Sequence, residues 1–155
     1  LQAFGVPAHA LHLEITESAV LGEQAAVRSN LAALTALGTP LELDDFGIGY
    51  SSLAHLKNLP VAAVKLDRAF IMSVHESASA QAVVRAAIDM AHALGKSVVA
   101  EGVERPEQLA LLVQMGCDVM QGYHLSAPVP AESFAALVRQ RAAGLPFAQD
   151  SRPAV

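Results

Sequence analysis

Short apolar segments alternate with longer helix-like segments along most of this chain, and this alternation restricts the folds that it can adopt. Short runs rich in Val, Ile and Leu are typical of strands buried on both faces. We predict strands over residues 11–15, 41–44, 61–67, 97–100 and 119–121. We predict helices over residues 23–37, 79–94, 106–116 and 131–141. Such an order predicts an α/β fold with a parallel sheet and right-handed crossovers.

Glycines mark the ends of three of these helices. Gly38, Gly95 and Gly116 each follow an apolar stripe with helical spacing, at the place where a left-handed residue ends a helix. The helix predicted over 106–116 begins with a proline, which suits a first helical turn. Within it, Leu109, Leu112 and Val113 are predicted to face the core.

Two architectures fit a parallel sheet of this size. A doubly wound sheet suits the length of 155 residues, whereas a (β/α)₈ TIM-type barrel needs about 250 residues. In a barrel every strand end faces one mouth, but in an open sheet functional groups gather at one switch point. Polar residues at or near the ends of all five predicted strands favour an incomplete barrel with about five C-terminal βα units: Glu14, Asp44, Asp45, Lys65, Asp67, Glu101 and Gln121.

Composition narrows the class of protein. With 53% apolar and 16% charged residues, the chain is typical of a globular domain. Its net charge of −5 argues against a nucleic-acid polymer as partner. A single cysteine, Cys117, suits a reducing compartment and is expected to fill space in the core. The six histidines lack metal-ligand spacing, and no apolar run is long enough to span a membrane.

The chain is expected to form one domain over residues 1–142, followed by a flexible tail over 143–155 that contains Gly-Leu-Pro and Ser-Arg-Pro. It begins with Leu1 rather than Met, from which we expect that the start of the protein is missing.

The adjacent carboxylates Asp44 and Asp45 are the strongest sign of chemistry. Two such groups repel each other unless they are solvated or share a cation. Carboxylate and amide oxygens suit Mg²⁺, Mn²⁺ or Ca²⁺, and an Asp pair could hold two ions for phosphodiester hydrolysis. Lys65 could then balance charge on a phosphoryl oxygen or orient water, and Glu101 could accept a proton from that water.

Simpler interpretations stay open for the same residues. Asp45 could be only the N-cap of the next helix. Lys65 and Asp67 could form a plain ion pair, and Glu104 could merely favour the start of the helix at Pro106. Carboxylates and a lysine on barrel strands could also stabilise an enolate during proton abstraction.

Five motifs in order resemble the C-terminal part of EAL domains, bacterial phosphodiesterases that linearise cyclic di-GMP. They read LHLEITES, LELDDFGIGYSSL, VKLDRAF, VVAEGVE and CDVMQGY, and the resemblance covers about residues 1–138. It implies a (β/α)₈ barrel with one antiparallel strand, two Mg²⁺ or Mn²⁺ ions and cyclic di-GMP as substrate. The Glu-Ala-Leu signature and the later asparagine ligand are absent from the sequence, and both are expected before Leu1.

The resemblance implies a role for each matching residue. Glu14 and Asp44 are expected to bind the first metal, and Asp44 and Asp45 the second. Catalytic roles in handling the attacking water fall to Lys65, Glu101 and Gln121. The remaining assignments are a loop-anchoring or supporting role for Glu17, Glu104 and Asp67, and substrate contacts for Tyr123 and Pro128.

Departures from the family pattern are small. Ile48 replaces a small residue or threonine, and Leu125 and Ala127 replace an aromatic residue and a lysine after QGY. The last two changes bear on guanine or phosphate contacts.

We therefore expect the parent protein to be a cyclic di-GMP phosphodiesterase that works in the cytoplasm, with an inactive cyclic di-GMP receptor or interaction domain as the alternative. The resemblance also implies a homodimer through the region of residues 45–52, and upstream sensory or GGDEF-type domains in a parent that a membrane could anchor. The 155-residue chain alone is expected to lack catalysis and to self-associate, because an incomplete barrel has unpaired edges.

Overall fold

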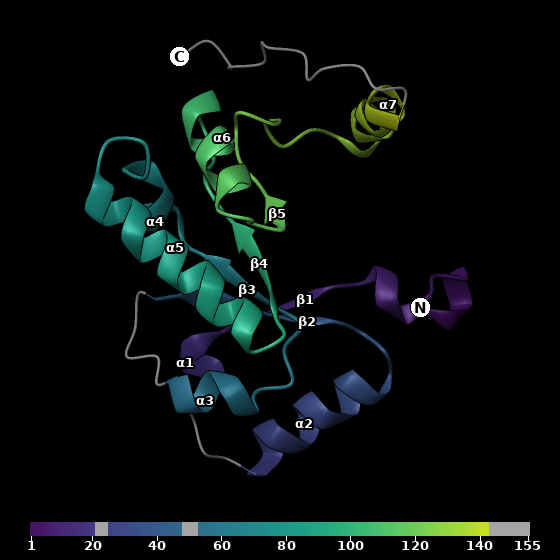
Figure 1. Cartoon of the computed structure of the whole chain (residues 1–155). Coiled ribbons are helices and arrows are strands. Elements are labelled where there is room, and N and C mark those ends of the chain that lie inside the picture. The colour runs from purple at the N-terminus through teal and green to yellow at the C-terminus, as the bar shows by residue number, and fades with distance from the viewer. Residues whose placement is uncertain (21–24, 48–52, 143–155) are drawn as a thin grey trace.

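A computed structural model describes residues 1–20, 25–47 and 53–142 of the chain. Its centre is one parallel sheet in the strand order β1-β2-β3-β4-β5 (Figure 1). The five strands are β1 Leu13–Thr16, β2 Leu41–Phe46, β3 Ala63–Leu66, β4 Ser97–Ala100 and β5 Val119–Met120. All five predicted strands are confirmed, although β1 and β3 begin two residues later than predicted.

The strand order distinguishes the two architectures that the sequence left open. Each strand pairs in parallel with the next strand along the chain. A doubly wound sheet instead reverses its order at a switch point. Because the described strands never reverse, the sheet is that of an incomplete barrel.

Helices connect the strands and cover one side of the sheet (Figure 1). Four of them match predicted helices: α2 Ala25–Ala36, α5 Ala78–Ala93, α6 Pro106–Gln114 and α7 Ala131–Ala142. The sequence did not reveal the shorter elements, because so few residues carry too little periodicity. These are η1 Gln2–Phe4, η2 Ala8–Ala10, α1 Glu17–Val20, α3 Leu53–Asn58 and α4 Arg68–Met72.

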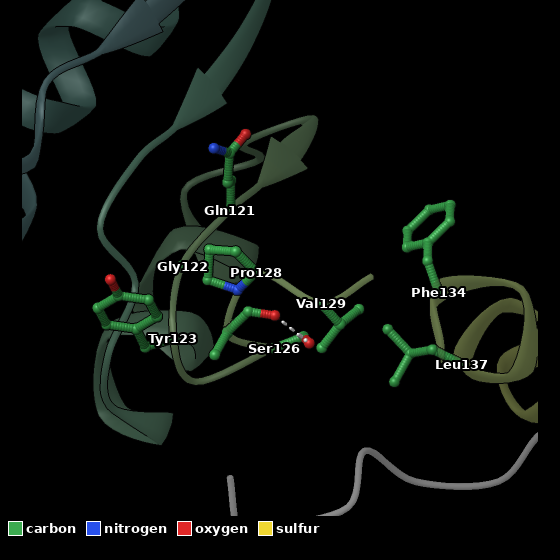
Figure 2. Close-up of a pocket in the computed structure, with 9 residues that line it drawn as sticks. Gln121, Gly122, Tyr123, Ser126, Pro128, Val129, Phe134 and Leu137 are labelled. Atoms are coloured by element: carbon green, nitrogen blue, oxygen red, sulfur yellow. Dashed lines mark hydrogen bonds between the residues drawn. The ribbon is translucent and has the colours of Figure 1, made fainter. Parts of the chain in front are cut away.

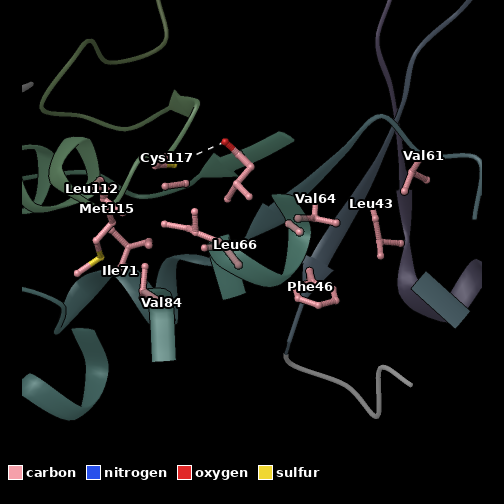
Figure 3. Packing of buried hydrophobic residues seen from close by; sticks show 14 of the residues in the cluster. Leu43, Phe46, Val61, Val64, Leu66, Ile71, Val84, Leu112, Met115 and Cys117 are labelled. Atoms are coloured by element: carbon pink, nitrogen blue, oxygen red, sulfur yellow. Dashed lines mark hydrogen bonds between the residues drawn. The ribbon is translucent and has the colours of Figure 1, made fainter. Parts of the chain in front are cut away.

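The core lies between the helices and alternate residues of the strands (Figure 3). Val64 and Leu66 of β3 point into it, and Ile88 of α5 and Leu112 of α6 are fully buried against them. Cys117 is also buried there, as predicted, and burial raises the pKa of its thiol. The prediction for Val113 was wrong, because its side chain is 58% exposed on the outer side of α6.

The predicted helix ends are confirmed where the structure describes them. Gly38, Gly95 and Gly116 all have left-handed backbone angles, with φ of 81°, 70° and 76°. The predicted tail over 143–155 lies outside the described residues. Within the described part of the chain, no helix is both long and apolar enough to span a membrane.

Candidate functional site

The face of the sheet opposite the core carries the candidate site. Residues alternate between faces along a strand, so Leu43, Val64 and Leu66 enter the core while Asp44 and Lys65 point to the other side. In the parallel register, Thr16 of β1 lies beside Asp44 of β2. The strands thus bring their polar residues together at the carboxyl end of the sheet.

Lys65 is the centre of this cluster. Its ammonium Nζ lies 2.7 Å from Oε1 of Glu14, 3.1 Å from Oδ1 of Asp44 and 2.6 Å from Oε1 of Glu101. The lysine side chain is only 4% exposed, whereas that of Glu14 is half exposed. One buried cation therefore binds carboxylates from β1, β2 and the end of β4. Three of the predicted site residues thus contact a fourth, Lys65.

These contacts fix the protonation state of the lysine. Burial by itself lowers the pKa of Lys65, but hydrogen bonds to Glu101, Glu14 and Asp44 outweigh burial and hold that pKa well above its ordinary value. Lys65 is therefore an ammonium at neutral pH. It can donate hydrogen bonds and balance negative charge, but it cannot act as a general base.

Asp44 and Asp45 differ in exposure, although regular alternation along the strand would turn Asp45 toward the core. Asp44 is half-buried beside Lys65, while Asp45 is exposed. Asp45 has a φ of 57°, a left-handed angle that aspartate tolerates better than most residues. It lies where the β2–β3 register shifts between Leu43 and Phe46. The bulge frees Asp45 from the regular ladder and leaves its carboxylate available at the rim.

The supporting residues fall in different places. Asp67 is the N-cap of α4 and accepts a hydrogen bond of 2.7 Å from the Ala69 amide. Among the described residues, Lys65 pairs with Glu14, Asp44 and Glu101 but not with Asp67, so the alternative of a Lys65–Asp67 ion pair is wrong. Glu104 forms an ion pair of 2.9 Å with Arg68 instead of only preceding the next helix.

Glu17 is buried, and neither of its carboxylate oxygens has a hydrogen-bond partner among the described residues. Its predicted role in anchoring the loop over 44–52 stays a prediction, because residues 48–52 lie outside the described part of the chain. The departure at Ile48 lies in the same segment. The N-cap alternative for Asp45 is wrong, because Phe46 still belongs to β2 and no helix begins directly after Asp45.

Gln121, Tyr123 and Pro128 line one pocket of about 400 Å³ between the end of β5 and α7 (Figure 2). Phe134 and Leu137 of α7 form its opposite wall. The Gln121 side chain is exposed and, within the described residues, makes no hydrogen bond to the Lys65 cluster. Its catalytic role and the substrate contacts of Tyr123 and Pro128 remain predictions.

The donor set has the chemistry of a site for a hard divalent cation. Three carboxylates around one ammonium leave an excess of negative charge, and Asp45 adds another carboxylate nearby. Carboxylate oxygens suit Mg²⁺ and Mn²⁺. Over the described residues, however, no three acidic, histidine or cysteine side chains are arranged as a metal site. Glu14, Asp44 and Glu101 bind the Lys65 ammonium instead.

Sequence reasoning missed Arg68 and Gln108. Arg68 pairs with Glu104, and Gln108 is buried and bonds to the residues that follow β4. A glutamine two residues after a helix-initiating proline was a signal for Gln108, because this residue type at the third helical position often caps the helix. The contacts of Gln108 with α4 could not be predicted from the neighbouring sequence.

Comparisons with known proteins agree with this geometry. The family model for the EAL domain matches residues 1–128. The cyclic di-GMP phosphodiesterase NbdA of Pseudomonas aeruginosa is 43% identical over 139 residues, which cover 90% of this chain and 18% of that protein. The chain thus spans less than a fifth of the length of NbdA.

Two solved structures have the same fold. The structure of PaMucR phosphodiesterase in complex with c-di-GMP, a protein of P. aeruginosa, matches with a TM-score of 0.80 and 38% identity, over 86% of this chain and 54% of that one. The manganese and cyclic di-GMP complex of BlrP1 from Klebsiella pneumoniae matches with a TM-score of 0.76 and 35% identity, over 83% and 33%. The family match, the identities and the shared fold lead to one conclusion: this chain belongs to the EAL domain family.

Proposed function

We propose that the full-length protein hydrolyses cyclic di-GMP to the linear dinucleotide, and that this chain contributes the Lys65 cluster to its active site. The observation that supports this most directly is the convergence of Glu14, Asp44 and Glu101 on one buried ammonium. Relatives that are named as cyclic di-GMP phosphodiesterases support the choice of substrate.

The proposed site uses two Mg²⁺ or Mn²⁺ ions, held in part by Glu14, Asp44 and Asp45. When bound, such ions polarise phosphoryl oxygens and lower the pKa of a bound water. The BlrP1 complex with manganese supports a divalent metal. Glu101 accepts the proton of the attacking water, and the Lys65 ammonium stabilises negative charge as it develops on the phosphoryl group. Gln121 orients the water through its amide, and Tyr123 and Pro128 contact the nucleotide.

The proposal extends to the setting of the enzyme. Cyclic di-GMP is the expected ligand, and a second copy of the chain is the expected partner, through the region of residues 45–52. The protein is proposed to act in the cytoplasm, with sensory or GGDEF-type domains upstream.

The test is product formation by the full-length protein. Cyclic di-GMP is incubated with the protein and Mg²⁺ or Mn²⁺, and the linear dinucleotide is quantified by chromatography. We expect turnover that chelation with EDTA abolishes, and that Lys65→Met reduces by at least about a hundredfold. Lys57→Met is the matched control, because Lys57 is exposed on α3, and should keep full activity.

Absence of linear product with either metal would contradict the proposal. Binding of cyclic di-GMP without turnover would instead identify an inactive receptor.

A further inference from the structure

We infer that Gln108 is a positioning residue that holds the loop of residues 101–105 against α4, and thereby keeps Glu101 within bonding distance of Lys65. The inference concerns the site proposed above, and its kinetic consequence rests on the proposed function. Its structural consequence can be measured separately.

Gln108 uses its whole side-chain amide inside the protein. It is only 2% exposed. Its Oε1 accepts hydrogen bonds from the amides of Glu104, at 2.8 Å, and Arg105, at 3.0 Å. Its Nε2 donates to the carbonyls of Ile71, at 3.1 Å, and Met72, at 3.3 Å. Both the oxygen and the NH₂ group of this buried amide thus have hydrogen-bond partners.

The two sides of Gln108 belong to two parts of the site. Ile71 and Met72 end α4, which follows the strand that carries Lys65. The loop over 101–105 follows β4 and begins with Glu101. Lys65 and Glu101 meet at 2.6 Å, and the bond from the Glu101 amide to the Leu66 carbonyl holds the start of the loop beside β3. A displacement of the rest of the loop relative to α4 changes the direction in which the Glu101 side chain leaves that point.

Helix capping accounts for only half of these bonds. A glutamine at the third position of α6 that accepts from the Arg105 amide is one half of a capping box. Capping does not require the bonds to Ile71 and Met72, which lie 37 and 36 residues away in sequence. Those bonds join α6 and its preceding loop to a different element.

The start of the loop is also fixed, because the Glu101 amide donates to the carbonyl of Leu66 at 3.1 Å. Between the later loop residues and α4, the other polar contact is exposed. The Arg68–Glu104 ion pair also links the loop to α4, but the Arg68 side chain is half exposed, and exposed pairs contribute little. On the opposite side, the Val103 amide donates to the carbonyl of Gln121 at 3.0 Å, which fixes the loop relative to β5. Gln108 therefore provides the buried tie on the α4 side.

Two variants of the full-length protein weaken the Gln108 hydrogen bonds in different ways. Gln108→Glu keeps an acceptor for the two loop amides but places carboxylate oxygens against the carbonyls of Ile71 and Met72. Gln108→Asn adds no charge, but its shorter side chain cannot span both partners. The control is Gln114→Asn, the same change at an exposed position at the end of α6.

We expect both Gln108 variants to lower kcat for cyclic di-GMP by about tenfold or more, because small misplacements of catalytic groups are costly. KM should change by less than about threefold, because Gln108 does not contact the pocket beside Gln121. Amide hydrogen exchange should be faster across residues 101–107 in both variants and unchanged in Gln114→Asn. Circular dichroism is used to check that each variant is folded.

Hydrogen exchange can be measured even if the full-length protein has no phosphodiesterase activity. The result therefore distinguishes an error in the proposed function from an error in the role given to the Gln108 hydrogen bonds. Unchanged exchange in both folded Gln108 variants overturns the tie. Faster exchange with wild-type kcat in an active enzyme overturns the positioning role. If one variant does not fold, the other is judged by the same two criteria.

Discussion

Lys65 shows how one residue can both stabilise a fold and prepare a site. A buried ammonium is costly unless it is paired and hydrogen-bonded. Glu14, Asp44 and Glu101 supply that pairing, and the lysine in turn holds three carboxylates together that would otherwise repel one another. The carboxylates are therefore assembled by the protein itself.

Removing this ammonium should destabilise the chain. For Lys65→Met we expect the free energy of unfolding to fall by about 2 kcal/mol, because the carboxylates lose their common partner. Urea unfolding followed by circular dichroism measures this, with Lys57→Met expected within about 0.5 kcal/mol of wild type. A Lys65→Met protein as stable as wild type would show that the carboxylates simply separate into solvent.

Asp118 gives a prediction of how the folding stability depends on pH. Hydrogen bonds from His92, at 2.8 Å, and from the Val98 amide, also at 2.8 Å, lower the pKa of Asp118 below its ordinary value. A lowered pKa in the folded state contributes stability that is complete above the unfolded pKa of about 4 and is lost as pH falls through the folded value.

The measurement compares wild type with Asp118→Asn in urea between acid and neutral pH. We expect wild type to be the more stable protein at neutral pH, and the difference to shrink as the pH falls below about 4. A difference that does not depend on pH would contradict the role of the Asp118 charge.

At the scale of the elements, the ends of β4 and β5 are joined by a close backbone approach. A Cβ atom on Gly122 would lie 2.2 Å from the carbonyl oxygen of Val103 and 2.3 Å from its amide nitrogen. Both are backbone atoms, so neither can rotate away. The loop that carries Glu101 can approach the segment after β5 only because residue 122 has no side chain.

Gly122→Ala should therefore cost about 3 kcal/mol of folding free energy, since the backbones must move apart. Gly116→Ala is the matched control: it also has a positive φ, but nothing lies within 4 Å of the place that an added methyl group would take. The control should lose only about 1–2 kcal/mol, from left-handed strain. Equal losses for the two variants in urea unfolding would contradict the close-approach argument.

The sequence predicted the strands and the gathering of polar residues at their ends because these signals are local, but it did not predict that the carboxylates bind the Lys65 ammonium. Apolar runs that end in polar residues place Glu14, Asp44 and Lys65 at one edge of a parallel sheet before any contact is known. The short α4 and the roles of Arg68 and Gln108 could not be predicted, because their partners are distant in sequence. Val113 was misplaced because an apolar stripe does not show how wide the buried face of its helix is.

At the scale of the whole molecule, the sheet has two edges. Among the described strands, β1 pairs only with β2, and β5 only with β4. Large apolar side chains are also exposed, among them Phe4, Leu37 and Tyr123. Unpaired strand edges and exposed apolar side chains each favour association between copies.

We expect the isolated 155-residue chain to form oligomers whose mass rises with concentration, as measured by size-exclusion chromatography with light scattering. Val119→Lys places a charge on an exposed residue of the β5 edge and should reduce the mass. The control Val83→Lys makes the same change on the exposed side of α5, away from both edges, and should have little effect. A monomeric wild-type chain at all concentrations would contradict the expectation.

The strand order has a consequence for how this chain is made. Each strand pairs with the one before it, so every new pairing closes a loop of a single βα unit rather than a loop of the whole chain. During synthesis, β3 can join the β1–β2 pair as soon as it leaves the ribosome, and β4 and β5 can follow in turn. The members of the Lys65 cluster are then made in order: Glu14 and Asp44 come first, the lysine that holds them together follows, and Glu101 completes the cluster last.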